Sequence, residues 1–158
     1  WRNNRMKLLL QCVQNASVYV DTTCIGSIGR GLLVFLGISK EDTKEITEKM
    51  FEKMKKLRIF SDQEGKTNLS VQDIDGELLI ISQFTLYADC KKGNRPSFTY
   101  AGTSDQAEEL YEYFISLAKK HLPPNKVAHG MFGAHMEVSL LNDGPFTILL
   151  DSEEILKK

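Results

Sequence analysis

An unbroken apolar run from Leu32 to Leu36 constrains the fold of this chain more than any other feature. The run has the length of a strand, and it lacks the polar alternation of a strand with one wet face. Both of its faces must therefore be buried, as in the middle of a sheet that is covered on each side. Gly26, Gly29 and Gly31 precede the run and predict a tight connection into it. We expect a sheet with this run as its central strand.

Strand patterns recur on both sides of this central run. The two short segments Leu8 to Val13 and Ser17 to Val20 favour strands, with a hairpin turn at Asp21 to Thr23. Further strands are expected from Arg58 to Phe60, from Glu77 to Leu86 after an Asp75-Gly76 turn, from Glu137 to Leu141, and from Phe146 to Leu150. Between the last two, the residues Asn142 to Pro145 are typical of a turn.

Two segments have the periodicity of amphipathic helices. The first runs from Asp42 to Leu57, and the second is capped by Ser104-Asp105 and stopped by Pro123-Pro124. Two such helices suffice to cover one face of a sheet. The whole pattern predicts a single α/β domain with a mixed, largely antiparallel sheet and two main amphipathic helices.

Composition limits the setting in which the protein works. The 158 residues are 42% hydrophobic, enough for one domain with a full core, and the net charge of −1 provides no overall basic field. Any nucleic acid must therefore be bound by a local patch. The three cysteines lack a CxxC pair, which argues against a disulfide framework and a structural zinc. We expect a cytoplasmic protein without a membrane span.

The first five residues differ in character from the segment that follows. Trp1 to Arg5 precede a methionine, Met6, that opens directly into an apolar stretch. We expect residues 1–5 to be a remnant of expression and residues 6–158 to form the domain.

Polar residues interrupt the expected buried strand at Ser82, Gln83 and Thr85. The simpler interpretation is that two of the three face solvent as the strand leaves the core. The functional interpretation is a strand end that presents hydroxyls, an amide side chain and free backbone N–H groups to a carbonyl substrate, as an acyl-transfer site requires. The residues alone leave both interpretations open.

A hydroxyl nucleophile needs a base, and the histidines His121, His129 and His135 are the candidates. We interpret each as structural, because none stands in a catalytic pattern. The sequence contains no HExxH and no GxGxxG motif, so we expect neither a metal nor a cofactor.

Lys91, Lys92 and Arg95 form a compact basic cluster in the loop that follows the interrupted strand. A solvated loop is the simpler interpretation. Contact with RNA phosphates is the alternative, because Lys and Arg neutralise backbone phosphates without reading sequence.

Several motifs together resemble one family, the D-aminoacyl-tRNA deacylases. They are Gln14–Val18, Gly29–Val34, Ser82–Leu86, Lys92–Phe98, Phe132–Ala134 and Asn142–Pro145, in the family's order and spacing from Met6 to about Asp151. The resemblance implies barrel-like layers, a homodimer, and hydrolysis of the ester that joins a D-amino acid to the 3′ end of tRNA. Glycyl-tRNA is also an expected substrate.

The resemblance also assigns roles to residues. A Gly144-Pro145 pair, held cis and donated across the dimer interface, excludes L-residues by shape. Backbone N–H groups of Phe84 and Thr85 polarise the carbonyl, and the terminal ribose hydroxyl helps to activate water; Thr85 as a nucleophile lacks an evident base. The residues implied around the ester are Ser82, Gln83, Phe84 and Thr85 at the reaction centre, and Phe132, Gly133, Ala134 and Met136 on the substrate.

One position departs from the family pattern. Phe146 replaces the usual Val after Gly-Pro, and a related deacylase that acts on L-alanine mischarged to tRNA carries Phe there. That relative has Pro and Ala where this chain has Ser82 and Phe84, which places the chain with the D-specific enzymes. Two alternatives stay open. A nucleic-acid-binding protein of this fold is expected to carry long charged tails, and a generic esterase a histidine dyad; we see neither pattern.

Overall fold

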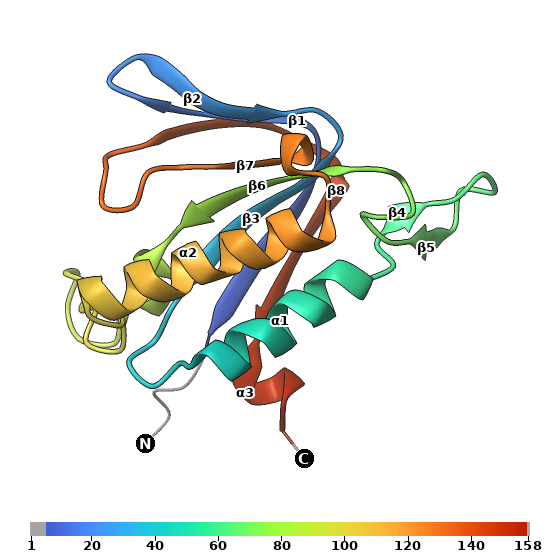
Figure 1. The fold of residues 1–158 in the computed structure, drawn as a ribbon. Coiled ribbons are helices and arrows are strands. Elements are labelled where there is room, and N and C mark those ends of the chain that lie inside the picture. The colour runs from blue at the N-terminus through green and yellow to red at the C-terminus, as the bar shows by residue number, and fades with distance from the viewer. Residues whose placement is uncertain (1–5, 158) are drawn as a thin grey trace.

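The computed structural model describes residues 6–157, so the prediction about residues 1–5 falls outside the described part of the chain. The chain folds into two layers, a strongly curved sheet and a pair of helices (Figure 1). The elements are β1 (Lys7–Val20), β2 (Thr23–Ile28), β3 (Gly31–Gly37), α1 (Lys44–Lys56), β4 (Phe60–Ser61), β5 (Thr67–Leu69), β6 (Glu77–Ser82), η1 (Phe84–Tyr87, a 3₁₀ turn), α2 (Ser104–His121), η2 (Pro124–Lys126), β7 (Val127–His129), β8 (Glu137–Asp151) and α3 (Ser152–Ile155).

The apolar run occupies the centre of the sheet, as predicted. Its strand β3 pairs antiparallel with β1 and parallel with β6, in a strand order β2-β1-β3-β6-β7 with β8 on the free side of β1. β7 pairs parallel with β6, so β3, β6 and β7 all point the same way. β3 begins with glycine at residue 31 because any other residue would clash there: a Cβ would lie 1.9 Å from the carbonyl oxygen of Glu77 on β6.

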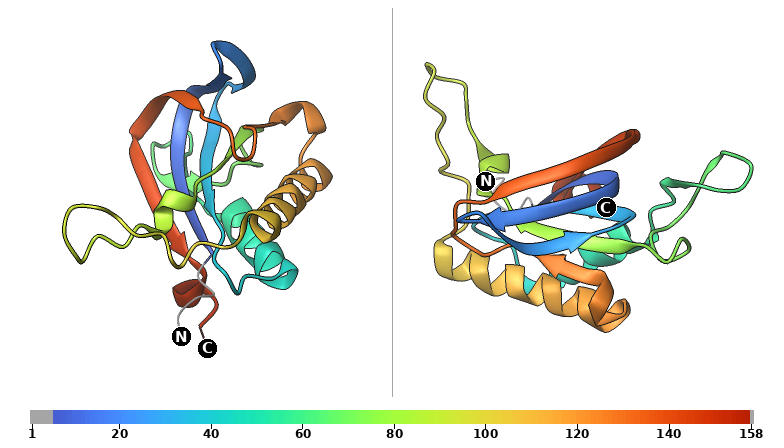
Figure 2. Two further views of the ribbon diagram at one scale, coloured as in Figure 1. Left: turned by 90° about the vertical axis from the view of Figure 1, so that its left-hand side faces the viewer. Right: turned by 90° about the horizontal axis from the view of Figure 1, so that it is seen from above.

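Helices α1 and α2 cover one face of the sheet, as expected (Figures 1 and 2). Met50 and Phe51 from α1 and Phe114 from α2 are almost fully buried in the larger core, where the rings of Phe51 and Phe114 meet edge to face at 5.4 Å. The N-cap of each helix lies one residue from the expected position, because the hydroxyls of Thr43 and Thr103 accept the capping hydrogen bonds in place of Asp42 and Ser104.

The other face of the sheet is covered at one end only. There β2 curls toward β7 until Gly26 lies against the backbone of His129, which nearly closes a barrel around a second, smaller core. At the other end, Leu9 pairs with Phe35 on one side and Leu149 on the other, so all three share one face. Leu149 is 54% exposed and the other two are half-buried.

The first two predicted strands are a single strand. β1 runs unbroken from Lys7 to Val20, and a register shift between Val13 and Asn15 re-aligns its two halves with β8. The predicted turn at Asp21 to Thr23 does form a hairpin. It joins β1 to β2, a strand that was not predicted because its segment contains a glycine. The brief strand expected at Arg58 to Phe60 lies at Phe60–Ser61 and pairs with β5.

The predicted turn at Asn142 to Pro145 is not a chain reversal. Both flanking segments pair antiparallel with the same strand, β1, so β8 is one long strand with a bulge. Gln11 pairs with Thr147, and Val13 pairs with Asn142. Between these two pairs β1 advances two residues and β8 advances five. The Asn142 side chain closes the bulge by donating to the carbonyls of Cys12 at 2.9 Å and Phe146 at 3.1 Å.

The strand that carries the polar residues is shorter than predicted. β6 ends at Ser82, and the 3₁₀ turn η1 begins at Phe84, so Gln83 and Thr85 are not strand residues. This ending explains the polar interruption, because those side chains leave the buried sheet at that point.

Candidate active site

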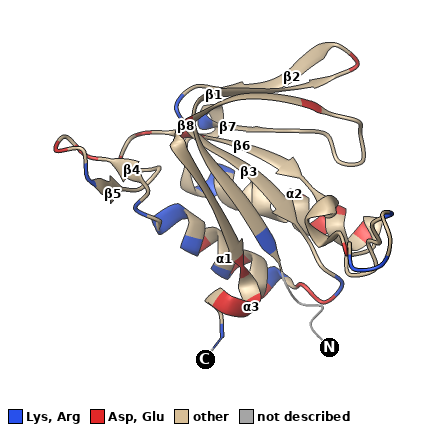
Figure 3. Ribbon diagram, turned by 180° about the vertical axis from the view of Figure 1, so that it is seen from behind, with Lys and Arg blue, Asp and Glu red and all other residues tan. Residues whose placement is uncertain are grey.

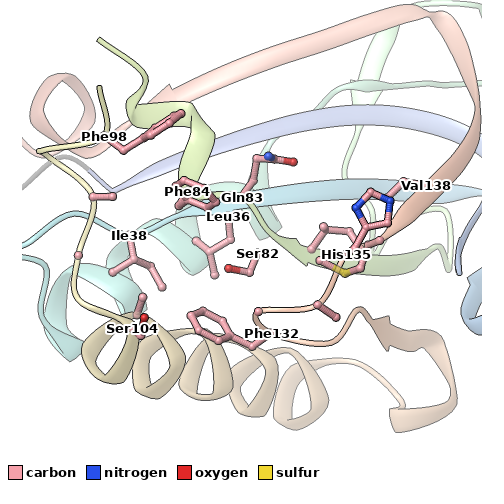
Figure 4. A pocket seen from close by; sticks show the side chains of 17 residues that line it. Leu36, Ile38, Ser82, Gln83, Phe84, Phe98, Ser104, Phe132, His135 and Val138 are labelled. Carbon is pink, nitrogen blue, oxygen red and sulfur yellow. The ribbon is translucent and has the colours of Figure 1, made fainter. Parts of the chain in front are cut away.

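A cavity of about 540 Å³ opens where the parallel strands β3, β6 and β7 end. Ligands in sheets with parallel strands commonly bind outside the carboxyl ends of those strands. The lining residues come from these strand ends, from η1 and the loop that leads to α2, from the start of α2, and from the β7–β8 connection with the start of β8 (Figure 4). They are Leu36, Ile38, Ile81, Ser82, Gln83, Phe84, Phe98, Ala101, Gly102, Ser104, Ala107, Phe132, Gly133, Ala134, His135, Met136 and Val138.

Three of the four predicted reaction-centre residues line the cavity, and Thr85 does not. The backbone N–H of Gln83 donates to Leu36 O at 2.9 Å, which anchors the residue after β6 to the end of β3. The Gln83 side-chain amide then donates to Thr85 Oγ1. In the described chain this is the only hydrogen bond of the Thr85 hydroxyl, so no base contacts it.

Two backbone donors are free beside the cavity. The N–H groups of Phe84 and Thr85 open the turn η1 and have no acceptor within residues 6–157, as the first donors of a helical turn do. The Phe84 ring is 57% exposed and meets Phe98 edge to face at 5.0 Å. A carbonyl oxygen placed here would meet preorganised donors.

The opposite wall, residues 132 to 136, is firmly held. Gly130 N–H donates to Ile80 O at 3.0 Å, and the single proton of the Tyr111 hydroxyl lies between Ile80 O at 2.9 Å and Gly130 O at 3.3 Å from Oη. The Phe132 ring packs on Tyr111 at 5.9 Å. Burial raises the pKa of Tyr111 far above its ordinary value, so this anchor stays a donor at every physiological pH. All four residues expected to bind substrate, Phe132, Gly133, Ala134 and Met136, line the cavity.

The basic cluster lies at the tip of the loop between η1 and α2 (Figure 3). Lys91, Lys92 and Arg95 are exposed, and the loop's base is closed by paired backbone hydrogen bonds between Asp89 and Ser97 at 2.7 and 2.9 Å. Because Phe98 follows this base and lines the cavity, the basic tip is tied to the cavity's edge.

Gly144 and Pro145 do not line the cavity of their own chain. They lie exposed on the β8 bulge, joined by a cis peptide bond. Gly144 has φ +128°, a conformation that glycine adopts and other residues avoid.

His135 is one of several lining residues that the sequence pattern did not assign to the site, together with Ile38, Ser104 and Val138. Its ring borders the cavity beside Val138, although the pattern favoured a structural role for it (Figure 4). Its position in the sequence could have indicated a place in the site, because His135 lies within the segment Phe132 to Met136, whose other residues were expected to bind substrate.

Metal clusters and membrane-spanning helices are both absent from the described part of the chain. Residues 6–157 contain no group of three or more His, Cys, Asp or Glu side chains placed to hold a metal ion. No helix among them is long and apolar enough to cross a membrane.

The fold and cavity define a mixed α/β protein with a ligand-sized cleft at the ends of parallel strands. A family model described as "D-Tyr-tRNA(Tyr) deacylase" matches residues 9–151. The D-aminoacyl-tRNA deacylase of Thermosipho africanus is 52% identical over 150 residues, which cover 95% of this chain and 99% of that protein. The chain therefore belongs to the D-aminoacyl-tRNA deacylase family, whose members are hydrolases.

Solved structures agree on the fold. A structure named "c-Myc DNA Unwinding Element Binding Protein" superimposes with a TM-score of 0.86 at 45% identity, covering 91% of this chain and 97% of that one. A probable eukaryotic D-amino acid tRNA deacylase gives a TM-score of 0.80 at 19% identity, covering 93% and 99%. The likeness to the second structure extends to the barrel-like sheet with its covering helices.

Proposed function

We propose that this protein hydrolyses the ester bond between a D-amino acid and the 3′ end of tRNA. The observation that carries the proposal is the cavity at the ends of β3, β6 and β7, with two free backbone donors at its edge. Family membership supplies the substrate class. Glycyl-tRNA fits the same proposal, because glycine has no side chain for a chiral filter to reject.

The proposed reaction uses backbone donors instead of a side-chain nucleophile. The N–H groups of Phe84 and Thr85 hold the carbonyl oxygen as negative charge develops on it, and the free hydroxyl of the terminal ribose helps to activate the attacking water. Thr85 is held by the Gln83 amide away from the cavity, which supports a positioning role for its side chain.

Chiral selection is assigned to Gly144 and Pro145 of a second copy. Two observations support this part of the proposal: the pair is exposed and remote from its own cavity wall, and the Leu9, Phe35 and Leu149 face of the sheet is left open. An apolar face of this kind favours association with another copy. Each cavity would then be completed by its partner's bulge.

The basic loop is proposed to hold the RNA. Lys91, Lys92 and Arg95 are exposed at the tip of a loop whose base adjoins the cavity-lining Phe98, and they can neutralise phosphates of the single-stranded tRNA end without reading its sequence. A tRNA substrate also supports the proposal that the protein works in the cytoplasm.

A pair of variants at residue 84 tests the backbone-donor mechanism. Phe84→Ala removes the ring and keeps the N–H, whereas Phe84→Pro removes both; proline is tolerated at the first position of a helical turn. With D-tyrosyl-tRNA as substrate, we expect kcat of the proline variant to be about a hundredfold below that of the alanine variant. Equal kcat values in the two variants, with both folded, would contradict the mechanism.

A second candidate function is nucleic-acid binding without catalysis, favoured by the DNA-binding name of the 45% identical structure. The two functions separate in one experiment. A wild-type protein that binds duplex DNA and leaves D-tyrosyl-tRNA intact supports the second candidate, and multiple turnovers of D-tyrosyl-tRNA support the first.

A further inference from the structure

His135 differs from every other residue that borders the cavity. Among the seventeen lining residues it is the one side chain that ionises; the others are apolar, glycine, hydroxyl or amide. The ester carbonyl itself is uncharged, and it is already assigned to the backbone donors of Phe84 and Thr85. The imidazole at the cavity's border therefore calls for a different partner.

The ring nitrogens of His135 have no partner in the described chain. Neither accepts nor donates a hydrogen bond within residues 6–157. The other two histidines are engaged, since His129 Nδ1 lies 2.7 Å from Gly130 O and the His121 ring packs on Phe51 at 5.5 Å. Both nitrogens of His135 are thus available to a ligand.

The position of the ring fits the outer part of the ligand. His135 lies at the end of the cavity opposite Ile38 and Ser104, and its side chain is exposed to solvent (Figure 4). The wall that carries it is anchored through Gly130 and Tyr111, so the ring is presented from a held backbone. A group that remains partly in water as the ester end enters would meet this ring.

We propose that His135 binds the 5′-phosphate of the terminal nucleotide. This inference rests on the proposed function, in which the ester on the terminal ribose enters the cavity. The 5′-phosphate is attached to that same ribose and leads back toward the rest of the tRNA, so it must lie where the cavity opens to solvent, as His135 does. An imidazole donates to a phosphate oxygen, and its protonated form adds charge attraction.

The test compares two small esters that differ only in this phosphate, 3′-O-D-tyrosyl adenosine and its 5′-monophosphate. For the wild-type protein we expect the phosphorylated ester to have a KM about tenfold lower, as one charge-assisted hydrogen bond provides. His135→Phe should remove this preference, with kcat on each ester within about threefold of wild type. His135→Gln keeps a donor and should retain part of the preference. His121→Gln, far along α2, serves as the matched control and should retain all of it.

The possible outcomes separate the inference from the function beneath it. A wild-type protein that hydrolyses both esters with equal KM overturns the phosphate contact alone. The contact is likewise overturned if His135→Phe keeps the wild-type preference for the phosphorylated ester. An equal fall of kcat on both esters also overturns it, because that result would show that His135 supports the cavity wall or takes part in the reaction. Hydrolysis of neither ester by the wild-type protein overturns the proposed function and this inference with it.

Discussion

At the scale of single residues, the hydroxyl of Thr85 is the feature that decides between two mechanisms. It accepts a hydrogen bond from the Gln83 amide and does not border the cavity. A nucleophile would need the reverse arrangement, with its oxygen in the cavity and a base beside it.

Thr85→Ala is therefore expected to keep most of the activity. The change removes one exposed hydrogen bond to Gln83, so turnover of D-tyrosyl-tRNA should fall by no more than about tenfold. Quenching the reaction and searching for acylated protein by mass spectrometry checks the same point. Abolished turnover in a folded Thr85→Ala protein, or an acyl group on Thr85 in the wild type, would show a covalent mechanism.

Asp42 gives a prediction about pH. Burial raises the pKa of this carboxyl from 3.8 to about 6, although Asp42 Oδ2 accepts a hydrogen bond from Ser39 N at 2.7 Å. The folded protein then holds this proton more tightly than the unfolded chain does. The contribution of Asp42 to the free energy of unfolding therefore falls as pH rises from about 4 to above 6.

Urea unfolding of the wild type and Asp42→Asn measures this contribution. Between pH 8 and pH 5 the wild type should gain about 1 kcal/mol relative to the variant, because only the wild type can take up the proton. An equal response of both proteins to pH would show that the Asp42 carboxyl titrates normally in the fold.

At the scale of elements, the bulge in β8 is the feature that joins fold and site. Asn142 bridges its two ends by donating to Cys12 O and Phe146 O. The exposed Gly144 and Pro145 are held between these ends, so their position depends on the Asn142 side chain.

Asn142→Ala should loosen the bulge. Two half-buried carbonyls lose their donor, and we expect the free energy of unfolding to fall by about 2 kcal/mol and turnover of D-tyrosyl-tRNA to fall with it. Thr147→Val is the control, because its exposed hydroxyl lies at the same bulge; this change should stay within about 0.5 kcal/mol. A stable, fully active Asn142→Ala protein would show that the Asn142 side chain is not needed to hold Gly144 and Pro145 in place.

The same strand shows where sequence patterns stop predicting structure. Helices α1 and α2 and the central strand β3 follow from apolar periodicity and uninterrupted burial, which are local signals. Asn142 to Pro145 have the composition of a turn, and only the pairing of both flanks with β1 makes them a bulge. Ser82 and Gln83 stood out as polar residues that interrupt an apolar strand pattern, and Phe84 was found through motif resemblance. His135 was missed because its role depends on which wall its segment forms.

At the scale of the whole molecule, one end of the sheet lies open. Leu149 is 54% exposed beside Leu9 and Phe35, while the helices cover the opposite face. Burying this surface against a second copy would also bring a second bulge into reach of the cavity. Association and activity are thus expected to be lost together.

Leu149→Glu tests that link. A charge on this face should convert the proposed dimer to a monomer in analytical ultracentrifugation, and turnover of D-tyrosyl-tRNA should fall at least about tenfold. Ile25→Glu makes the same change on β2, away from this face, and should leave both properties unchanged. An active Leu149→Glu monomer would show that one chain forms a complete site.

The most direct test of the central claim is the ratio of kcat/KM for D-tyrosyl-tRNA and L-tyrosyl-tRNA with the wild-type protein. Both esters share the same tRNA, ribose and side chain, so the ratio reports only the handedness of the substrate. The proposed site predicts a preference for the D-ester of about a hundredfold or more. Equal values for the two esters, or a preference for the L-ester, would contradict it.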